Sequence, residues 1–262
     1  MKMTKTQQGY TLIELMIAGV LGIFLLGGAM QVFFSSSQTT SLQSAMADLQ
    51  ERSRFISMYL NNEFERAGWL EPVIAAAGAS TPPTAVTFSG TSETAEDILP
   101  CNGGSTMCDR IRITYNGIRD CLGAQVNGGN IGVVTNTYFV QNGELRCEGN
   151  TAGVNDVILN NVVSFQLLYG LDDSDGQGLP YTSVNDNDDG LIDRYVEAFD
   201  FNTSGLETLR AIRFAILLES PENAFDENTA STFTLFNETP LTFNDRQMRL
   251  LVSGTSIVAN GE

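Results

Sequence analysis

The stretch Gly9–Phe34, GYTLIELMIAGVLGIFLLGGAMQVFF, decides how the rest of the chain is organised. From Leu15 to Phe34 it contains no charged residue, and about 20 such residues are enough to cross a bilayer as a helix. One carboxylate, Glu14, stands at its start, where an acid is costly unless it finds a partner or the headgroup layer. The stretch therefore predicts a membrane-spanning helix whose acid needs a partner.

The charged residues on either side of this span predict its orientation in the membrane. Lys2 and Lys5 precede it, and the next charged residue after Glu14 is Asp48. Positive charge beside a span stays on the cytoplasmic side, so we expect the amino end inside and the rest of the chain outside. A secretory signal would carry its cleavage site after the apolar run, whereas here Gly9 precedes it.

The residues Gly9-Tyr10-Thr11-Leu12-Ile13-Glu14-Leu15 resemble the processing signal of type IV pilins and pseudopilins. The resemblance implies that residues 1–9 are a leader, which a prepilin peptidase removes after Gly9, and that the new terminus at Tyr10 is N-methylated. It also implies that Glu14 pairs with the terminal amine of a neighbouring subunit during assembly. An amine and a carboxylate on packed helices neutralise each other where neither is stable alone. A plain membrane anchor with Glu14 in the interface is the alternative interpretation.

Composition excludes several classes of function. The chain has 262 residues, 14 basic against 31 acidic residues, and a net charge of −17. Such a surface repels phosphate backbones, so we expect no direct nucleic-acid partner. The chain has no histidine, which excludes Ser-His-Asp and Cys-His catalysis, and it carries no nucleophile motif. We therefore expect a protein that is not an enzyme.

All four cysteines lie beyond the span, where an exported location favours disulfides. Their spacing lacks a C-x-x-C pair, which argues against a zinc site. Of the three possible connectivities we favour Cys101–Cys108 and Cys121–Cys147, because the second would join the base of a predicted hairpin.

The apolar pattern predicts a helix that continues from Thr11 to Ala67, with Gly68 and Pro72 at its end. Its second half is amphipathic, and the residues that should face the domain are Leu42, Met46, Leu49, Ile56, Leu60, Phe64 and Ala67. We therefore divide the chain into residues 10–34, which span the membrane and polymerise, residues 35–68, which form the amphipathic half, and an exported β-rich domain, residues 69–262. The membrane half also contains Gly19, Gly22, Gly27 and Gly28. These glycines favour either close packing against other helices or local unwinding of this helix in a filament.

Strand signals then follow one another along the domain. An Asn-Gly pair at 142–143 predicts a hairpin turn. A long helix followed by runs of strand predicts an α+β fold, with the helix packed on an antiparallel sheet. Val163, Phe165, Leu167 and Tyr169 should line the face that meets the helix. The predicted strands are Ala85–Ser89, Arg110–Tyr115, Gly132–Val140, Glu144–Cys147, Val157–Tyr169, Leu209–Glu219, Thr232–Phe236 and Gln247–Ser253.

Two acidic runs in the middle of the chain resemble part of a calcium loop. The second run has oxygen-bearing residues at alternate positions, then Gly190 for a sharp turn. Val196 occupies the position where a bidentate glutamate is expected, so the first run would have to supply ligands. An exposed turn is the alternative interpretation. The candidate ligands of a structural Ca²⁺ are Asp172, Asp173, Asp175, Asn185, Asn187, Asp189 and Asp193.

Segments of the predicted domain resemble one particular branch of the type IV pilins. Phe165–Asp172, Asp193–Val196, Leu209–Ala215 and the closing strand resemble minor pilins of the PilW type. This resemblance implies a minor pilin that works with other minor and major pilins, a prepilin peptidase, an inner-membrane assembly platform and, before assembly, membrane lipid. A pseudopilin of a type II secretion tip complex and a tip-exposed adhesin or calcium-binding module are the alternatives.

Overall fold

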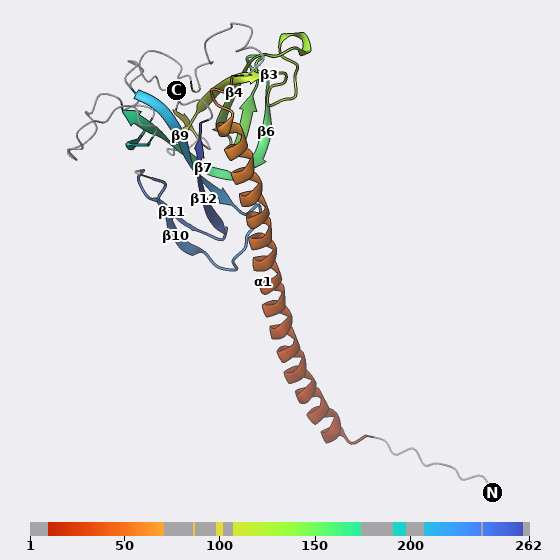
Figure 1. The fold of residues 1–262 in the computed structure, drawn as a ribbon. Coiled ribbons are helices and arrows are strands. Elements are labelled where there is room, and N and C mark those ends of the chain that lie inside the picture. Colours follow the sequence, from red (N-terminus) through yellow and green to blue (C-terminus); the bar gives the residue numbers. More distant parts are fainter. Residues whose placement is uncertain are drawn as a thin grey trace.

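The computed structural model describes residues 10–70, 86, 98–101, 107–173, 191–197, 207–236 and 238–258. One long helix, α1 (Leu12–Glu65), projects far beyond a domain built from antiparallel strands (Figure 1). Its 54 residues correspond to roughly 80 Å. The predicted α+β class is confirmed, and the helix begins and ends within about two residues of the predicted bounds.

Two capping arrangements fix the ends of α1. Thr11 has an extended backbone, and its side-chain oxygen accepts from the Glu14 amide. At the other end, the Arg66 and Ala67 amides donate to the Glu63 and Phe64 carbonyls, and the Gly68 amide donates to Thr114 on a strand. The helix therefore passes directly from its last turn into contact with the domain.

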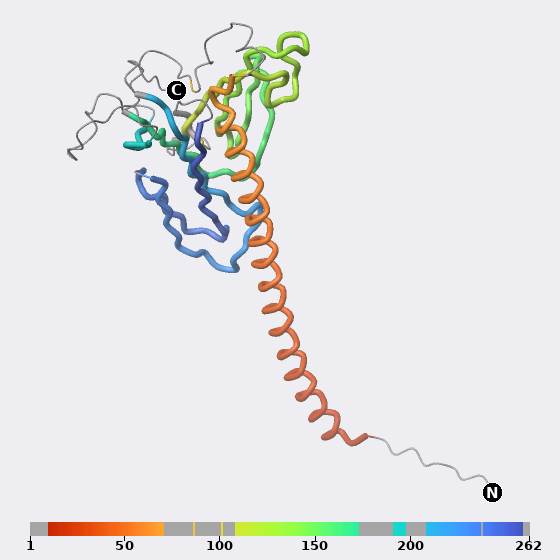
Figure 2. Tube along the Cα trace, in the orientation of Figure 1, coloured from red at the N-terminus to blue at the C-terminus, as the bar shows by residue number. Residues whose placement is uncertain are grey.

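The domain contains two four-stranded antiparallel sheets, with strand orders β12-β9-β7-β8 and β3-β4-β5-β6, and two further strand pairs, β1-β2 and β10-β11. The antiparallel pairing is as predicted, and the strands of the candidate sheet divide between these two larger sheets. Figure 2 shows the C-terminal segment of the chain, in dark blue, beside the second half of α1. A 3₁₀ turn, η1 (Asn127–Gly129), precedes β4. The strands are β1 (Ile98–Pro100), β2 (Met107–Asp109), β3 (Ile111–Gly117), β4 (Gly132–Gln141), β5 (Glu144–Glu148), β6 (Asn155–Asn160), β7 (Val162–Asp173), β8 (Arg194–Val196), β9 (Glu207–Glu219), β10 (Thr229–Phe233), β11 (Leu241–Asp245) and β12 (Arg249–Ile257).

The predicted single strand Val157–Tyr169 is wrong, because the chain turns at Asn161. This residue has a φ of 58°, a left-handed conformation that interrupts a strand and that asparagine tolerates. Before it, β6 pairs with β5, and after it, β7 pairs with β9. One asparagine therefore moves the chain from one sheet to the other. The turn between β4 and β5 is the predicted one, with positive φ at both Asn142 and Gly143.

The core lies where the second half of α1 meets the sheets. The helix contacts β12 and β9, and Leu49, Ile56, Leu60 and Phe64 are buried in a cluster that draws on both four-stranded sheets. The ring of Phe64 packs edge-on against Phe214 of one sheet and Tyr138 of the other. A single aromatic residue of the helix thus joins the two sheets.

Two details of the predicted core need correction. Met46 is 53% exposed, so it does not belong to the buried stripe, which becomes fully buried from Leu49 onward. Phe165, Leu167 and Tyr169 join the core beneath the helix as predicted. Val163 instead packs on the opposite face of the sheet, because the register shifts between Val162 and Ser164.

Of the predicted strand Ala85–Ser89, only Val86 lies among the described residues, and it pairs with Ile113.

The packing of the Phe214 ring on β12, beneath α1, depends on Gly254. This glycine pairs with Phe214 of β9, and a Cβ there would lie 2.6 Å from the tip of the Phe214 ring. Two residues further on, the Ser256 hydroxyl donates to the side-chain oxygen of Asn61 on the helix at 2.5 Å. A small residue at 254 therefore lets the Phe214 ring cover β12 beneath the helix.

We expect Gly254→Val to lower the free energy of unfolding by about 1–3 kcal/mol, because the added side chain displaces the Phe214 ring from its contact with Phe64. Thermal unfolding of the full chain in detergent, followed by circular dichroism, measures the change. Thr255→Val, at an exposed neighbouring position, is the matched control and should alter stability by less than about 0.5 kcal/mol. Equal stability of the two variants would refute this role of Gly254.

Candidate functional site

The first half of α1 exposes its whole apolar surface. Large side chains on every side of the helix are solvent-exposed, and Phe24 and Leu25 are each 75% exposed. By length and composition this helix could cross a membrane. So much apolar area is unfavourable in water and calls for lipid or for other apolar helices. The predicted membrane segment thus makes no intramolecular contact that would hide it within the described residues.

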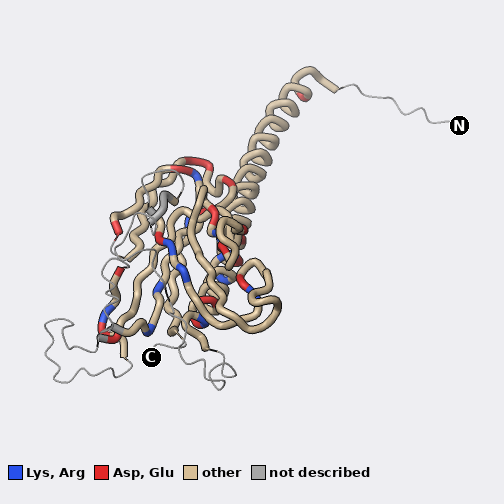
Figure 3. The backbone as a smooth tube through the Cα atoms, turned by 90° about the horizontal axis from the view of Figure 1, so that it is seen from above, with Lys and Arg blue, Asp and Glu red and all other residues tan. Residues whose placement is uncertain are grey.

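Glu14 lies in the first turn of this apolar helix. Its amide donates to the Thr11 carbonyl at 3.1 Å and to the Thr11 hydroxyl at 3.4 Å, and a carboxylate in a first turn interacts favourably with the helix dipole. From Tyr10 to Ala47 the sequence has no other charged residue. In Figure 3 the projecting half of the helix is almost entirely tan, whereas the blue and red positions gather on the domain.

The neighbouring Tyr10 is 86% exposed, so the position that would become the new terminus is accessible. Gly9 lies outside the described residues. The structure therefore places Glu14 and Tyr10 together at the far end of the projecting helix. An amine from another chain could reach this carboxylate without displacing any part of the described domain.

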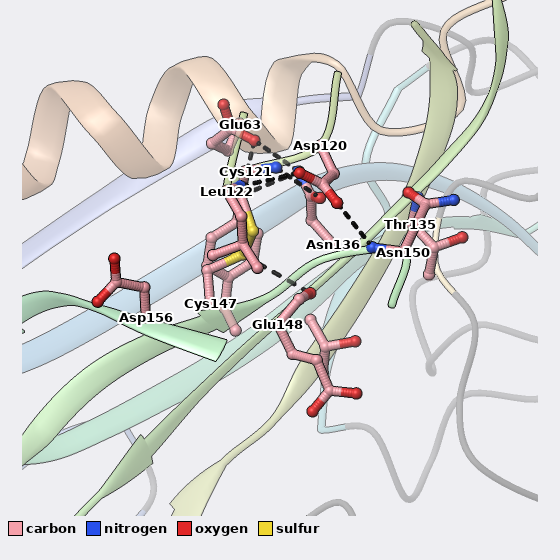
Figure 4. The surroundings of a disulfide bond; sticks show 12 residues. Glu63, Asp120, Cys121, Leu122, Thr135, Asn136, Cys147, Glu148, Asn150 and Asp156 are labelled. Atoms are coloured by element: carbon pink, nitrogen blue, oxygen red, sulfur yellow. Dashed lines mark hydrogen bonds between the residues drawn. A yellow bond between two sulfur atoms is a disulfide. The ribbon is translucent and has the colours of Figure 1, made fainter. Parts of the chain in front are cut away.

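A second functional feature, which the sequence analysis missed, is a polar cluster beneath the other end of α1 (Figure 4). The buried carboxylate of Glu63 accepts from the Tyr138 hydroxyl at 2.6 Å and from the Asn136 side-chain amide at 3.3 Å. The Arg66 guanidinium contacts its other oxygen at 3.4 Å. These contacts fix the end of the helix to β4.

The same cluster extends to a disulfide. The side-chain oxygen of Asn136 accepts from the Cys121 amide at 3.0 Å, so Asn136 links the Glu63 carboxylate to the Cys121–Cys147 bond. Both disulfides, Cys101–Cys108 and Cys121–Cys147, have the predicted connectivity. The second joins β5 to the loop between β3 and β4.

Asp120 organises that loop from a buried position. One of its carboxylate oxygens accepts from the amides of Leu122 and Ala124, and the other accepts from the Asn150 amide. Asn150 in turn accepts from the Thr135 amide. Sequence could have signalled Glu63, a charged residue three positions after Leu60 on the buried stripe. Asp120 and Asn136 carried no comparable signal.

Three tyrosines surround the cluster, and burial raises the pKa of each. The pKa of Tyr59 rises to about 12, and that of Tyr138 lies well above its usual value. The pKa of Tyr115 is raised as well. Loss of hydration is the main cause in each case, and the negative charge of Glu63 adds to it. All three phenols are therefore neutral at physiological pH.

We expect the stability of the domain to fall as the pH rises above about 10, where tyrosines of the unfolded chain ionise. Below that pH the phenols are neutral in both states, and the full stability is present. Between about 10 and 12 the unfolded state gains by losing protons while the buried phenols keep theirs. Spectrophotometric titration of the folded protein should show that Tyr59, Tyr115 and Tyr138 keep their protons above pH 10. Ionisation of these three phenols at the pH at which tyrosines of the unfolded chain ionise would contradict this expectation.

The predicted calcium ligands fall mostly outside the described residues: Asp175, Asn185, Asn187 and Asp189, and the side chain of Asp173, are among those not described. Asp172 is buried and pairs with Arg210 of β9 at 2.9 Å. The Asp193 amide donates to the Leu171 carbonyl. Among the described residues no group of three acids, cysteines or histidines is placed to hold a metal. Structural calcium stays a prediction, which calorimetry with calcium against magnesium would test.

An exposed apolar helix with an acid at its start, joined through its amphipathic half to antiparallel sheets, is the arrangement that the resemblance to type IV pilins implies. Residues 132–260 match the family model PilW, type IV pilus-assembly protein W. The resemblance predicted from the sequence is therefore confirmed, and it supports a role in the type IV pilus.

Comparison with solved structures finds the type IV-like pilin TTHA1219 from Thermus thermophilus at 14% identity and a TM-score of 0.41. That match covers 81% of this chain and 95% of the pilin. No curated protein matches the sequence.

Proposed function

We propose that this chain is a minor pilin that helps to start or cap a type IV pilus. The match of residues 132–260 to the PilW family, combined with an uncovered apolar helix that begins at a single carboxylate, carries the proposal. The apolar half of α1 supplies the driving force for leaving lipid and packing with other pilin helices. The amphipathic half of α1 and the sheets form the part that stays outside the membrane.

Processing precedes assembly in this proposal. A prepilin peptidase cuts after Gly9, and Tyr10 becomes the methylated amino terminus of the mature chain. Glu14 then pairs with the terminal amine of a neighbouring pilin. A carboxylate and an amine in an apolar bundle neutralise each other, whereas either alone would cost several kcal/mol. The pair therefore aligns subunits along the bundle as well as joining them.

The proposal includes a location for the chain, which the apolar half of α1 supports. The chain waits in the inner membrane with its amino end in the cytoplasm and its domain in the periplasm, and an assembly platform moves it into the pilus with other minor and major pilins. The protein performs no catalysis in this scheme. Its net charge of −17 and its lack of any basic run favour protein partners over nucleic acid.

Mass spectrometry of pili sheared from cells tests this function. We expect peptides of the chain in the sheared fraction, in substoichiometric amount, with a mature terminus that begins at methylated Tyr10. In cells without prepilin peptidase, the uncut chain should remain in the inner membrane. A chain that is found uncut in wild-type cells and is absent from sheared pili would refute the proposal.

A further inference from the structure

A groove lies beside the last turns of α1, at the end of the helix farthest from Tyr10. Its walls come from residues 62–69 of the helix end, from residues 115–119 at the end of β3 and from the end of β12, and its volume is about 780 Å³. We call it the distal groove. A chain anchored by its apolar half presents this groove away from the bilayer.

The distal groove combines exposed apolar side chains with positive charge. Trp69, Ile118 and Ile257 line it and are 41%, 46% and 71% exposed. Arg66, which also pairs with Glu63, and Arg119 line it as well, against the one carboxylate of Glu65, so that the charged lining is positive on balance. Tryptophan and arginine are the residues on which protein–protein affinity most often depends. A basic site on a chain with a net charge of −17 favours an acidic partner.

Asn116 adds a polar group that lacks a partner. Its side-chain carbonyl oxygen is buried at the groove and accepts no hydrogen bond from the described part of the chain. A buried acceptor without a donor costs about 1–3 kcal/mol. A segment that enters the groove and donates an N–H group to this oxygen would recover part of that cost.

The opposite end of the domain carries a complementary segment. The loop Pro221–Asn228, which we call the proximal loop, joins β9 to β10 and exposes Glu222, Asp226 and Glu227 around the half-buried Phe225. Its backbone is held by Arg246, whose side chain donates to the Phe225 carbonyl at 2.8 Å and whose carbonyl accepts from the Ala224 amide. The proximal loop is thus an ordered, acidic projection with apolar residues.

The helix sets the distance between the two features. The proximal loop contacts α1 at Ser41, whose hydroxyl donates to the Asn223 carbonyl, whereas the distal groove includes Arg66. The 1.5 Å rise per residue separates these levels by roughly 35 Å along the helix. Two pilins with parallel helices, displaced by this distance, would bring the proximal loop of one to the distal groove of the other.

We propose that the distal groove binds the acidic proximal loop of a second pilin-type subunit, which lies farther from the membrane and has its helix parallel to α1. The proposal rests on the function proposed above. Arg66 and Arg119 meet the carboxylates of the incoming loop, while Trp69, Ile118 and Ile257 cover its apolar residues. Such a head-to-tail contact does not close on itself, so it extends along a filament.

Site-specific photo-cross-linking in the full chain, in cells that assemble pili, tests the proposal. The photoreactive residue replaces Ile118 in the groove, Met58 on the exposed face of α1, or Val154 as an exposed control outside the groove. We expect the Ile118 probe to join an acidic loop at the membrane-facing end of another pilin-type chain, identified by peptide mapping. Adding Arg119→Glu should lower this yield about tenfold or more, whereas Arg54→Glu on the exposed helix should not.

The probes separate failure of this proposal from failure of the proposed function. A cross-link from Met58 to a pilin, without one from Ile118, overturns the groove and leaves the pilin role standing. Cross-links from Ile118 to a non-pilin protein, to a neutral or basic segment, or with equal yield after Arg119→Glu also overturn the groove. Absence of pilin cross-links from both positions overturns the proposed function itself.

Discussion

Replacing Glu63 with alanine is expected to lower the free energy of unfolding by about 3 kcal/mol, because it removes a buried hydrogen-bond acceptor. The substitution removes the acceptor of the Tyr138 hydroxyl and of the Asn136 side-chain amide, and it leaves both donors buried. For a domain of about 200 residues, this loss corresponds to a fall in Tm of roughly 10 °C.

The matched control is Glu65→Ala, two residues along the same helix and exposed, for which we expect a change below about 0.5 kcal/mol. Glu63→Gln retains an acceptor for Tyr138 and should lose less than half of the alanine variant's deficit. Denaturant unfolding of the full chain in detergent compares the three variants. If Glu63→Ala were as mild as Glu65→Ala, the polar cluster would not fix the helix to β4.

The polar cluster also connects the end of α1 to the loop between β3 and β4, which contains Cys121. Glu63 on α1, Asn136 on β4 and the Cys121 amide form one connected set of hydrogen bonds, and Asp120 holds the residues that follow Cys121. Loss of the carboxylate should therefore loosen the loop between β3 and β4 as well as the helix end. Faster amide exchange at Cys121 in Glu63→Ala would follow from this connection.

Local sequence signals predicted the features that depend on local chemistry. The glycine after the last helical turn and the Asn-Gly pair between β4 and β5 each act through neighbouring residues, so both could be predicted from local sequence. The disulfide connectivity was predictable because a hairpin brings Cys147 near the preceding loop. Strand β9 was predictable from the alternation of large apolar residues along it.

Features that depend on packing between distant segments were not predictable from these patterns. The break at Asn161 has the same apolar signal on both sides, and only the pairing partners of β6 and β7 separate the two sheets. Met46 fits the helical period, but its side chain is 53% exposed, and only the packing of the domain on the helix decides this. Glu63 and Asn136 are 73 positions apart in sequence, so no local pattern places them together.

The largest functional effect is expected at Glu14. In a packed bundle of pilin helices, Glu14→Lys replaces attraction toward a neighbouring terminal amine by repulsion between two cations. Losing one partner of a buried ion pair costs about 3–5 kcal/mol, so we expect incorporation into pili to fall by a hundredfold or more. Glu14→Gln, which keeps a hydrogen-bond acceptor, should fall less.

Two controls make this effect specific to assembly. Glu238→Lys makes the same change of charge at an exposed position of the domain, and it should leave incorporation unchanged. Cleavage after Gly9 should continue in the Glu14→Lys chain, because the glycine that marks the cut is retained. Membrane fractionation should recover the cleaved variant with the inner membrane.

The most direct measurement is therefore the amount of Glu14→Lys chain in sheared pili, relative to the wild-type chain, in cells where Gly9 cleavage of both is verified. We predict that the cleaved variant accumulates in the membrane, is nearly absent from the sheared fraction and fails to support normal numbers of surface pili. Wild-type incorporation and normal piliation with the cleaved Glu14→Lys chain would contradict an assembly role for this carboxylate.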